Sequence, residues 1–296
     1  MCLSWELGKG ELWIGSARVG RSLNHSMKIL LPIAALLAVL GFASAENEKP
    51  VGKPKALRVL MVTGGCCHDY ENQKGLLAEG LSARANVEFE IVHEEGPDGK
   101  KDKTHRISIY EKADWAKGYD VVLHNECFGG ITDSAFVEGI AKPHFDGVPA
   151  VMLHCSAHSY RAAATDEWRK CLGMKSMSHE KNRDLLVKNI APQHPVMKGF
   201  PAEWLDKADE LYKNEHLYEN FAPLAKAYGE DTKQDHVLVW TNQYGKGKVF
   251  ATTMGHNNST MEDPVFLDLV ARGLLWACDK LDEAGKPLPG FESQQK

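Results

Sequence analysis

The sequence predicts an α/β fold in which helices cover both faces of a mostly parallel sheet. Residues 57–65, "LRVLMVTGG", form an unbroken apolar run that ends in two glycines. Such a run is typical of a strand that is buried on both faces. Strand-like and helix-like segments then alternate along the first half of the chain, and this alternation implies right-handed crossovers between parallel strands.

The helices and strands of the first half are predicted from capping residues, prolines and the spacing of apolar residues. One helix is expected to begin at the N-cap Thr132 and to stop at Pro143, because proline usually ends a helix. The strands are expected at 57–65, 87–95, 119–126 and 148–155, and the helices at 69–84 and 132–143.

The second half has a different character. Residues 194–201 and 209–219 are turn-rich and polar-aromatic, whereas 236–257 is typical of a hairpin that turns at Gly245-Lys246-Gly247. Residues 263–281 predict an amphipathic helix with Asp263 as its cap and Pro264 in its first position.

The N-terminal region predicts export. "MKILLPIAALLAVLGFASAE" combines a lysine, an apolar run and the small-x-small pattern Ala43-Ser44-Ala45, which signal peptidase cleaves. The protein is therefore expected in the periplasm or outside the cell, with no stable membrane insertion after cleavage. The expected divisions are a mis-assigned upstream extension (1–26), a signal peptide (27–45), a linker (46–56), one domain (57–281) and a flexible tail (282–296).

Charge and cysteine content restrict the partners and the chemistry. The net charge is −5 and basic residues are mixed with acidic ones, so nucleic acid is not expected as a partner. The cysteines show no regular disulfide framework. A disulfide between neighbours strains the backbone, so Cys66 and Cys67 are expected to pair elsewhere or to stay free.

Polar residues follow several of the predicted strands. In open α/β sheets, ligands bind at the carboxyl ends of the strands, so these residues are expected to share one edge. They are residues 65–69 after the first strand, 124–126 in the third, 154–156 after the fourth and 255–257 after the hairpin.

An ordered series of motifs resembles the ThuA-like (trehalose utilisation) family over about residues 57–280. The motifs are "VLMVTGG" with His68, "LHCSAHS", "HPVMKGFP", "DELY", "YGKGKVFATTMGHN" and "VFLDLVARGLLWAC". The resemblance implies a flavodoxin-like three-layer sandwich of the class I glutamine amidotransferase-like type. It also implies a role in carbohydrate metabolism, of the trehalose or keto-glycoside kind, and a catalytic edge that carries His68, His154, Glu210 and His256.

A cysteine nucleophile is one interpretation of "LHCSAHS". Amidotransferases that share this fold place their cysteine in a Gly-x-Cys-x-Gly elbow, because glycines allow the tight turn that exposes the thiol. "MLHCSA" has neither glycine, and His154 rather than Cys155 falls at the elbow. We therefore expect that Cys155 is not a nucleophile.

A metal site is the second interpretation. His154 and His158 are four residues apart, and His68, His124, Glu126, Cys155 and His256 are further candidate ligands for a divalent ion such as zinc. The tentative ligand set is His154, His256 and His68. However, the spacing matches no compact metal-binding motif.

A non-covalent sugar site is the third interpretation. In "DELY", one of the adjacent carboxylates Asp209 and Glu210 can face the site while the other caps or pairs. The function classes that stay open are a carbohydrate-active enzyme, a sugar-binding accessory protein and an amidotransferase-type hydrolase, each as a monomer or a homo-oligomer. The expected substrate-binding residues are Asp69, Glu126, His158, Tyr160, Tyr212, His216 and Asn257.

The export signal makes a direct prediction about the mature chain. Protein isolated from its native host should begin at or near Glu46, because the lysine, the apolar run and the cleavage pattern occur in the required order. Edman sequencing or mass spectrometry of the N-terminal peptide measures this, and a chain that still carries residues 27–45 in the cytoplasm would contradict it.

Overall fold

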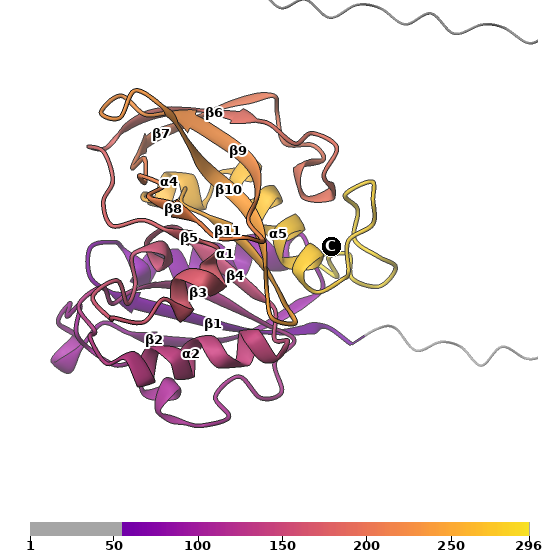
Figure 1. Ribbon diagram of the computed structural model, residues 1–296. Coiled ribbons are helices and arrows are strands. Elements are labelled where there is room, and N and C mark those ends of the chain that lie inside the picture. The colour runs from indigo at the N-terminus through magenta and orange to yellow at the C-terminus, as the bar shows by residue number, and fades with distance from the viewer. Residues whose placement is uncertain (1–54, 296) are drawn as a thin grey trace, which may run out of the picture. The chain divides into compact units, whose positions relative to one another are not determined.

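A nine-stranded mixed sheet organises the computed structural model, which describes residues 55–295 (Figure 1). The strand order is β2-β1-β3-β4-β11-β10-β9-β6-β7; neighbouring strands run parallel as far as β11 and antiparallel beyond it. The strands are β1 (Leu57–Gly65), β2 (Val87–Glu94), β3 (Val121–Cys127), β4 (Ala150–Leu153), β6 (Arg183–Asn189), β7 (Glu203–Asp209), β9 (Ala222–Tyr228), β10 (Asp235–Tyr244) and β11 (Gly247–Thr252). A second, two-stranded sheet pairs β5 (Met174–Lys175) with β8 (His216–Leu217).

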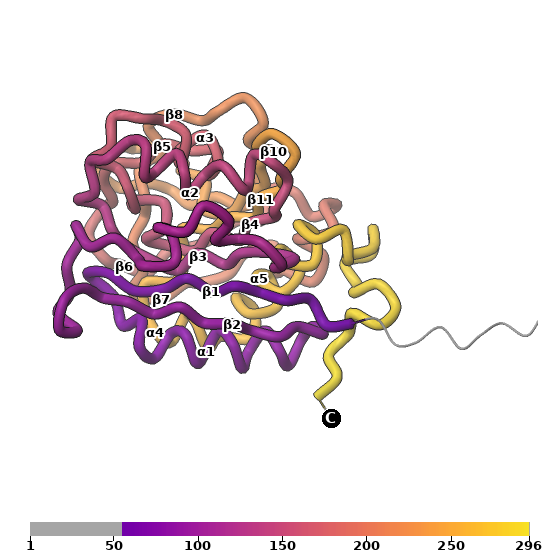
Figure 2. The backbone as a smooth tube through the Cα atoms, turned by 90° about the horizontal axis from the view of Figure 1, so that it is seen from below, coloured from indigo at the N-terminus to yellow at the C-terminus, as the bar shows by residue number. Residues whose placement is uncertain are grey.

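The parallel strands β1, β3, β4 and β11 are buried on both faces, whereas the edge strand β2 is only partly buried; this confirms the predicted α/β layering. In β1, Val59 and Met61 enter one core, whereas Leu60 and Val62 enter the core on the opposite face. Apolar residues of α1 and α5 join the first core and those of α2 and α3 join the second, so the sheet is the middle of three layers (Figure 2). The helices are α1 (Tyr70–Ser82), α2 (Ser134–Asp146), α3 (Glu167–Leu172), α4 (Asn258–Met261) and α5 (Pro264–Ala277), and the 3₁₀ helices are η1 (Pro97–Gly99), η2 (Ser108–Glu111), η3 (His154–Ala157) and η4 (Pro195–Met197).

The predicted ends of α2 were wrong. The N-cap is Asp133, whose carboxylate accepts a hydrogen bond from Phe136 N at 3.1 Å, and the helix continues past Pro143 to Asp146. A proline inside a helix leaves the carbonyl four residues earlier without its N–H donor. Here that carbonyl, of Gly139, accepts a hydrogen bond from Trp115 Nε1 at 3.3 Å, so the proline does not end the helix.

The second half contains five strands that the sequence analysis missed, namely β5, β6, β7, β8 and β9. The longer ones are only partly buried; in β6, Leu185 and Val187 are buried, Leu186 between them is exposed, and the flanking residues are charged or polar. The hairpin between β10 and β11 and the start of α5 at Pro264 confirm the corresponding predictions.

The described residues include almost all of the C-terminal end of the chain but not the N-terminal end. The predicted upstream extension, the signal peptide and most of the linker lie outside the described residues. Near the C-terminus, Phe291 packs against the first core and its carbonyl accepts a hydrogen bond from Asn86 N at 2.9 Å. The segment after residue 281 thus lies against the domain, and its flexibility stays a prediction.

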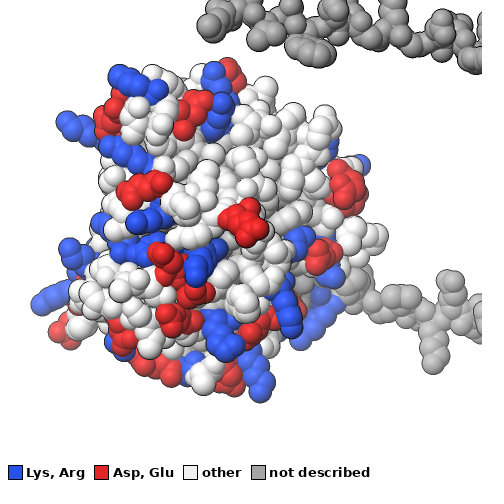
Figure 3. Space-filling model, viewed as in Figure 1, with Lys and Arg blue, Asp and Glu red and all other residues white. Residues whose placement is uncertain are grey.

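Two surface properties bear on the expected partners. Basic and acidic side chains are interspersed on the face drawn in Figure 3. Among residues 55–295, no helix has the length and apolarity needed to cross a bilayer.

The N-cap of α5 generates a stability prediction. The Asp263 carboxylate accepts a hydrogen bond from Val265 N at 2.7 Å. Asp263→Ala should lower the free energy of unfolding by about 1 kcal/mol, because it leaves an N–H group of the first helical turn without its acceptor. Asp263→Asn keeps an acceptor and is the matched control. Equal denaturant midpoints for the Ala variant and the wild type would count against this role of the cap.

Candidate functional site

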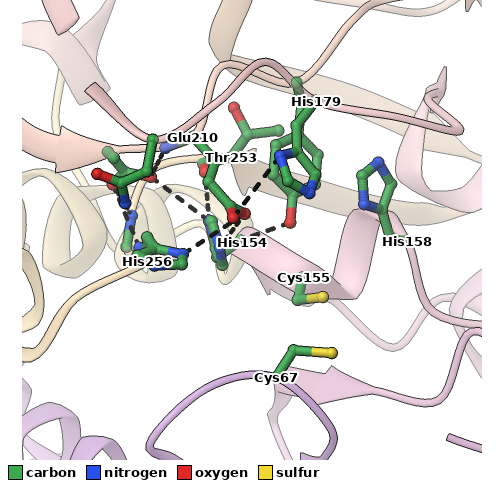
Figure 4. A network of polar contacts seen from close by, with 12 residues as sticks. Cys67, His154, Cys155, His158, His179, Glu210, Thr253 and His256 are labelled. Atoms are coloured by element: carbon green, nitrogen blue, oxygen red, sulfur yellow. Dashed lines mark hydrogen bonds and ion pairs between the residues drawn. The ribbon is translucent and has the colours of Figure 1, made fainter. Parts of the chain in front are cut away.

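Four side chains from three strand ends and one loop converge at one edge of the sheet; Figure 4 shows three of them, His154, Glu210 and His256. His68 follows β1, His154 follows β4, Glu210 follows β7 and His256 lies between β11 and α4. Each can offer one ligand atom such that all four atoms lie within 4.8 Å of one another. The structure therefore brings together the four residues predicted to be catalytic; their catalytic role stays a prediction.

His154 is held in one orientation by the backbone. It lies in the turn between β4 and η3 with a φ of 44°, so His154 occupies the elbow position, as predicted. Its Nδ1 donates a hydrogen bond to the carbonyl of Thr253 at 2.6 Å. Because a carbonyl can only accept, this bond places a proton on Nδ1, and Nε2 lies 3.5 Å from Glu210 Oε2.

Glu210 and His256 form a pair whose pKa values shift in opposite directions. Burial alone would raise the pKa of Glu210, but the adjacent imidazoles of His154 and His256 hold it well below its ordinary value. The contact with Glu210 raises the pKa of His256. His256 Nδ1 lies 3.4 Å from Glu210 Oε2, so the geometry and the shifts both favour an ionised carboxylate in the cluster.

His68 is the most perturbed member of the cluster. Burial, followed by the nearby His154 and His256, lowers the pKa of His68 to about 2, which keeps its imidazole neutral. Its ring centroid lies 4.5 Å from that of His154 and 4.9 Å from that of His256. Its Nδ1 is buried and has no hydrogen-bond partner within the described chain. A buried polar atom without a partner suggests that a ligand, an ion or a water belongs beside it.

Asp209 binds the backbone of two cluster residues and of Gly255. Its buried carboxylate accepts hydrogen bonds from the backbone nitrogens of Glu210 at 2.6 Å, Gly255 at 2.7 Å and His256 at 3.2 Å. This arrangement confirms that one of the two adjacent carboxylates faces the site while the other binds the backbone.

His68, Glu210 and His256 of the cluster line a cavity of about 410 Å³, whereas His154 is not among its lining residues. The rings of His158, Tyr212 and His179 lie along it, with His158 stacked on Tyr212 at a centroid distance of 4.0 Å. Sequence analysis did not find His179, which belongs to an irregular segment that carries no pattern. Lys103 and Arg161 also line the cavity.

Two disulfides line the same cavity, Cys66–Cys67 and Cys127–Cys155. The expectation that Cys66 and Cys67 do not pair with each other was therefore wrong, because the turn after β1 brings their sulfurs together, with Cys67 at a φ of 88°. Cys155 carries no free thiol, in agreement with the expectation that it is not a nucleophile.

The predicted substrate-binding residues divide into two groups. His158 and Tyr212 line the cavity, while Asp69 and Asn257 line an adjoining hollow that also includes His68 and His256. Neither hollow includes Glu126, Tyr160 or His216.

Glu126 and Tyr160 are buried in a separate network. Glu126 Oε1 accepts hydrogen bonds from Tyr110 at 3.0 Å, Tyr160 at 3.3 Å and His124 at 2.9 Å. These side chains point into a face of the sheet rather than toward its edge.

Three residues weighed as metal ligands are not part of the cluster. His124 and Glu126 belong to the buried network, and Nε2 of His158 lies 3.0 Å from Ser176 Oγ. His216 lies on β8 with its ring against Tyr218.

A buried carboxyl beneath the site generates a prediction about pH. Burial, followed by the charge of Asp209, raises the pKa of Asp206 to about 9. The unfolded value is about 3.9, so the stabilisation by this proton is complete below about pH 4 and is lost as the pH rises toward 9. Asp206→Asn carries no titrating proton and should reduce the loss of thermal stability between about pH 6 and pH 9.

Melting temperatures measured across this pH range test the prediction. The exposed Asp114, changed to Asn, is the matched control and should keep the wild-type pH dependence. An Asp206→Asn curve that runs parallel to the wild-type curve would show that Asp206 does not hold this proton.

Comparisons with known proteins agree with the fold. The family model described as ThuA, trehalose utilisation, matches residues 58–277. No curated protein sequence matches the chain. A protein described as ThuA-like from Parabacteroides merdae has a similar structure, with a TM-score of 0.59 and 19% identity over 82% of this chain and 93% of that chain.

A second protein described as ThuA-like, from Bacteroides uniformis, has a TM-score of 0.59 and 17% identity over 81% of this chain and 98% of that chain. At these identities the two structures show a shared fold only, and the family model carries the assignment. The chain belongs to the ThuA (trehalose utilisation) family.

Proposed function

We propose that this protein is an exported carbohydrate-active enzyme that acts on a sugar of the trehalose or keto-glycoside type. The reaction site is the cavity beside His68, His154, Glu210 and His256. The observation that carries the proposal is the convergence of these four buried or half-buried groups on one point, with an imidazole nitrogen of His68 that has no partner in the described chain. The family assignment supports the substrate class.

The protonation states of the cluster suit a divalent cation such as zinc. Three imidazoles and a carboxylate form a common donor set for zinc. His68 is neutral, Nδ1 of His154 is bound to Thr253 so that its Nε2 faces Glu210, and Glu210 is ionised. A backbone carbonyl behind a metal-binding histidine is a typical supporting contact. When bound, such an ion would supply a Lewis acid that polarises a sugar oxygen.

The residues themselves also support proton transfer. His256 is half-buried with a raised pKa, so it can carry a proton beside the ionised Glu210. Tyr212 and His158 form a stacked wall against which a sugar ring can lie. Acid/base chemistry without a metal is the second candidate, and this imidazole–carboxylate pair is the observation that favours it.

Metal analysis and turnover of the purified protein test the proposal together. We expect about one zinc or similar ion per chain, lost in His154→Ala, and a loss of turnover of trehalose-type keto-glycosides by about 10²-fold or more in both His154→Ala and Glu210→Gln. His216→Ala, outside the cavity, is the control and should behave as the wild type.

Chelation separates the candidates. Activity that is lost to a chelator and restored by a divalent ion supports the metal site, whereas activity that resists chelation supports acid/base work. Sugar binding without turnover would identify an accessory protein, and glutaminase activity blocked by thiol alkylation would identify an amidotransferase-type hydrolase. The proposal fails if neither variant alters turnover or ligand binding.

A further inference from the structure

The two disulfides of the cavity lie in contact with each other. Cys66 Sγ is 3.9 Å from Cys127 Sγ, so one sulfur of each pair faces the other. The backbone fixes this contact, because β1 and β3 are paired as far as Gly65 and Cys127, and Cys66 N donates a hydrogen bond to the carbonyl of Cys127 at 3.1 Å. The approach of the two pairs therefore follows from the strand register and not from flexible side chains.

Access from solvent decreases along the four sulfurs. Cys67 is exposed and Cys66 is partly buried, whereas Cys127 and Cys155 are only 5% and 6% exposed. An external thiol that approaches the cavity therefore meets the Cys66–Cys67 pair first. Reactivity in thiol–disulfide exchange depends on access as well as on the attacking thiol.

A purely structural role does not account for the Cys66–Cys67 bond. A disulfide stabilises a fold mainly by closing a loop in the unfolded chain, and the benefit grows with loop length. A bond between adjacent residues closes no such loop. Cys127–Cys155, which closes a loop with a sequence separation of 28, can act as a staple, but its contact with the first pair would be unnecessary for that.

We propose that the four sulfurs form a thiol–disulfide relay that passes two electrons from an external dithiol to the buried Cys127–Cys155 pair. The external dithiol reduces Cys66–Cys67 and is itself oxidised to its disulfide. The Cys66 thiolate then attacks Cys127 and displaces the Cys155 thiolate, which takes up a proton. Cys67 next attacks Cys66, which restores Cys66–Cys67 and releases Cys127 as the second thiol.

The relay ends beside the proposed reaction site but does not depend on it. Cys67 precedes His68 and Cys155 follows His154, so each disulfide includes the chain neighbour of a cluster histidine. Metal content and sugar turnover test the proposed function, whereas thiol exchange tests the relay, and either can fail alone.

The first test measures how fast the buried pair is reduced by thioredoxin, a protein dithiol too large to enter the cavity. Alkylation followed by peptide mass spectrometry reports the Cys127 and Cys155 thiols. In the double variant Cys66→Ser/Cys67→Ser we expect their appearance to slow by about tenfold or more, because access to the buried pair is lost. Cys278→Ser, a free cysteine outside the cavity, is the control. Equal rates in the double variant and the wild type would overturn the relay.

The second test traps the exchange step and does not need the double variant to fold. In Cys155→Ser, the freed Cys127 thiol lies beside Cys66 and should attack it, displacing the Cys67 thiolate. Peptide mapping without reduction should find a Cys66–Cys127 disulfide and an alkylated Cys67. A retained Cys66–Cys67 bond with an alkylated Cys127 would show that the two pairs do not exchange.

Discussion

The site depends on the carboxylate of Asp209. This buried group accepts backbone hydrogen bonds from Glu210, Gly255 and His256, and it thereby ties the end of β7 to the loop that follows β11. Burying a carboxylate is costly unless hydrogen bonds satisfy it, and backbone N–H groups are strong partners for it. Glu210 comes from the antiparallel half of the sheet and His256 from the hairpin side, and this acceptor binds the backbone of both.

A second backbone contact fixes His154. Leu153 of β4 pairs with Thr252 of β11, and at the next position of each strand His154 Nδ1 donates a hydrogen bond to the carbonyl of Thr253. Orientation by secondary structure is more exact than orientation by loops alone, since the strand pairing leaves little freedom to the residues that follow it. The imidazole of His154 is therefore held in one orientation before any ligand arrives.

The sequence predicted the parallel half of the fold well and the antiparallel half poorly. The strands β1, β3 and β4 begin as apolar runs because almost all of their residues are buried, whereas β6, β7 and β9 bury only some of their residues among exposed ones and resemble turns. The cluster of His68, His154, Glu210 and His256 came from the family resemblance and from strand ends. Glu126 could not be separated from it by sequence, because whether a residue at a strand end points to the edge or into a face depends on the register.

The pairing of β4 with β11 has a consequence for the order of events during synthesis. β11, the strand that pairs with β4, is synthesised only after β6, β7, β9 and β10. The edge of β4 therefore stays unpaired until most of the domain has left the ribosome. Until then, His154 lacks the carbonyl that fixes its ring. A ribosome-bound chain that ends before β11 cannot assemble the cluster, and the capacity to select a ligand arises as one of the last steps of folding rather than growing gradually with chain length.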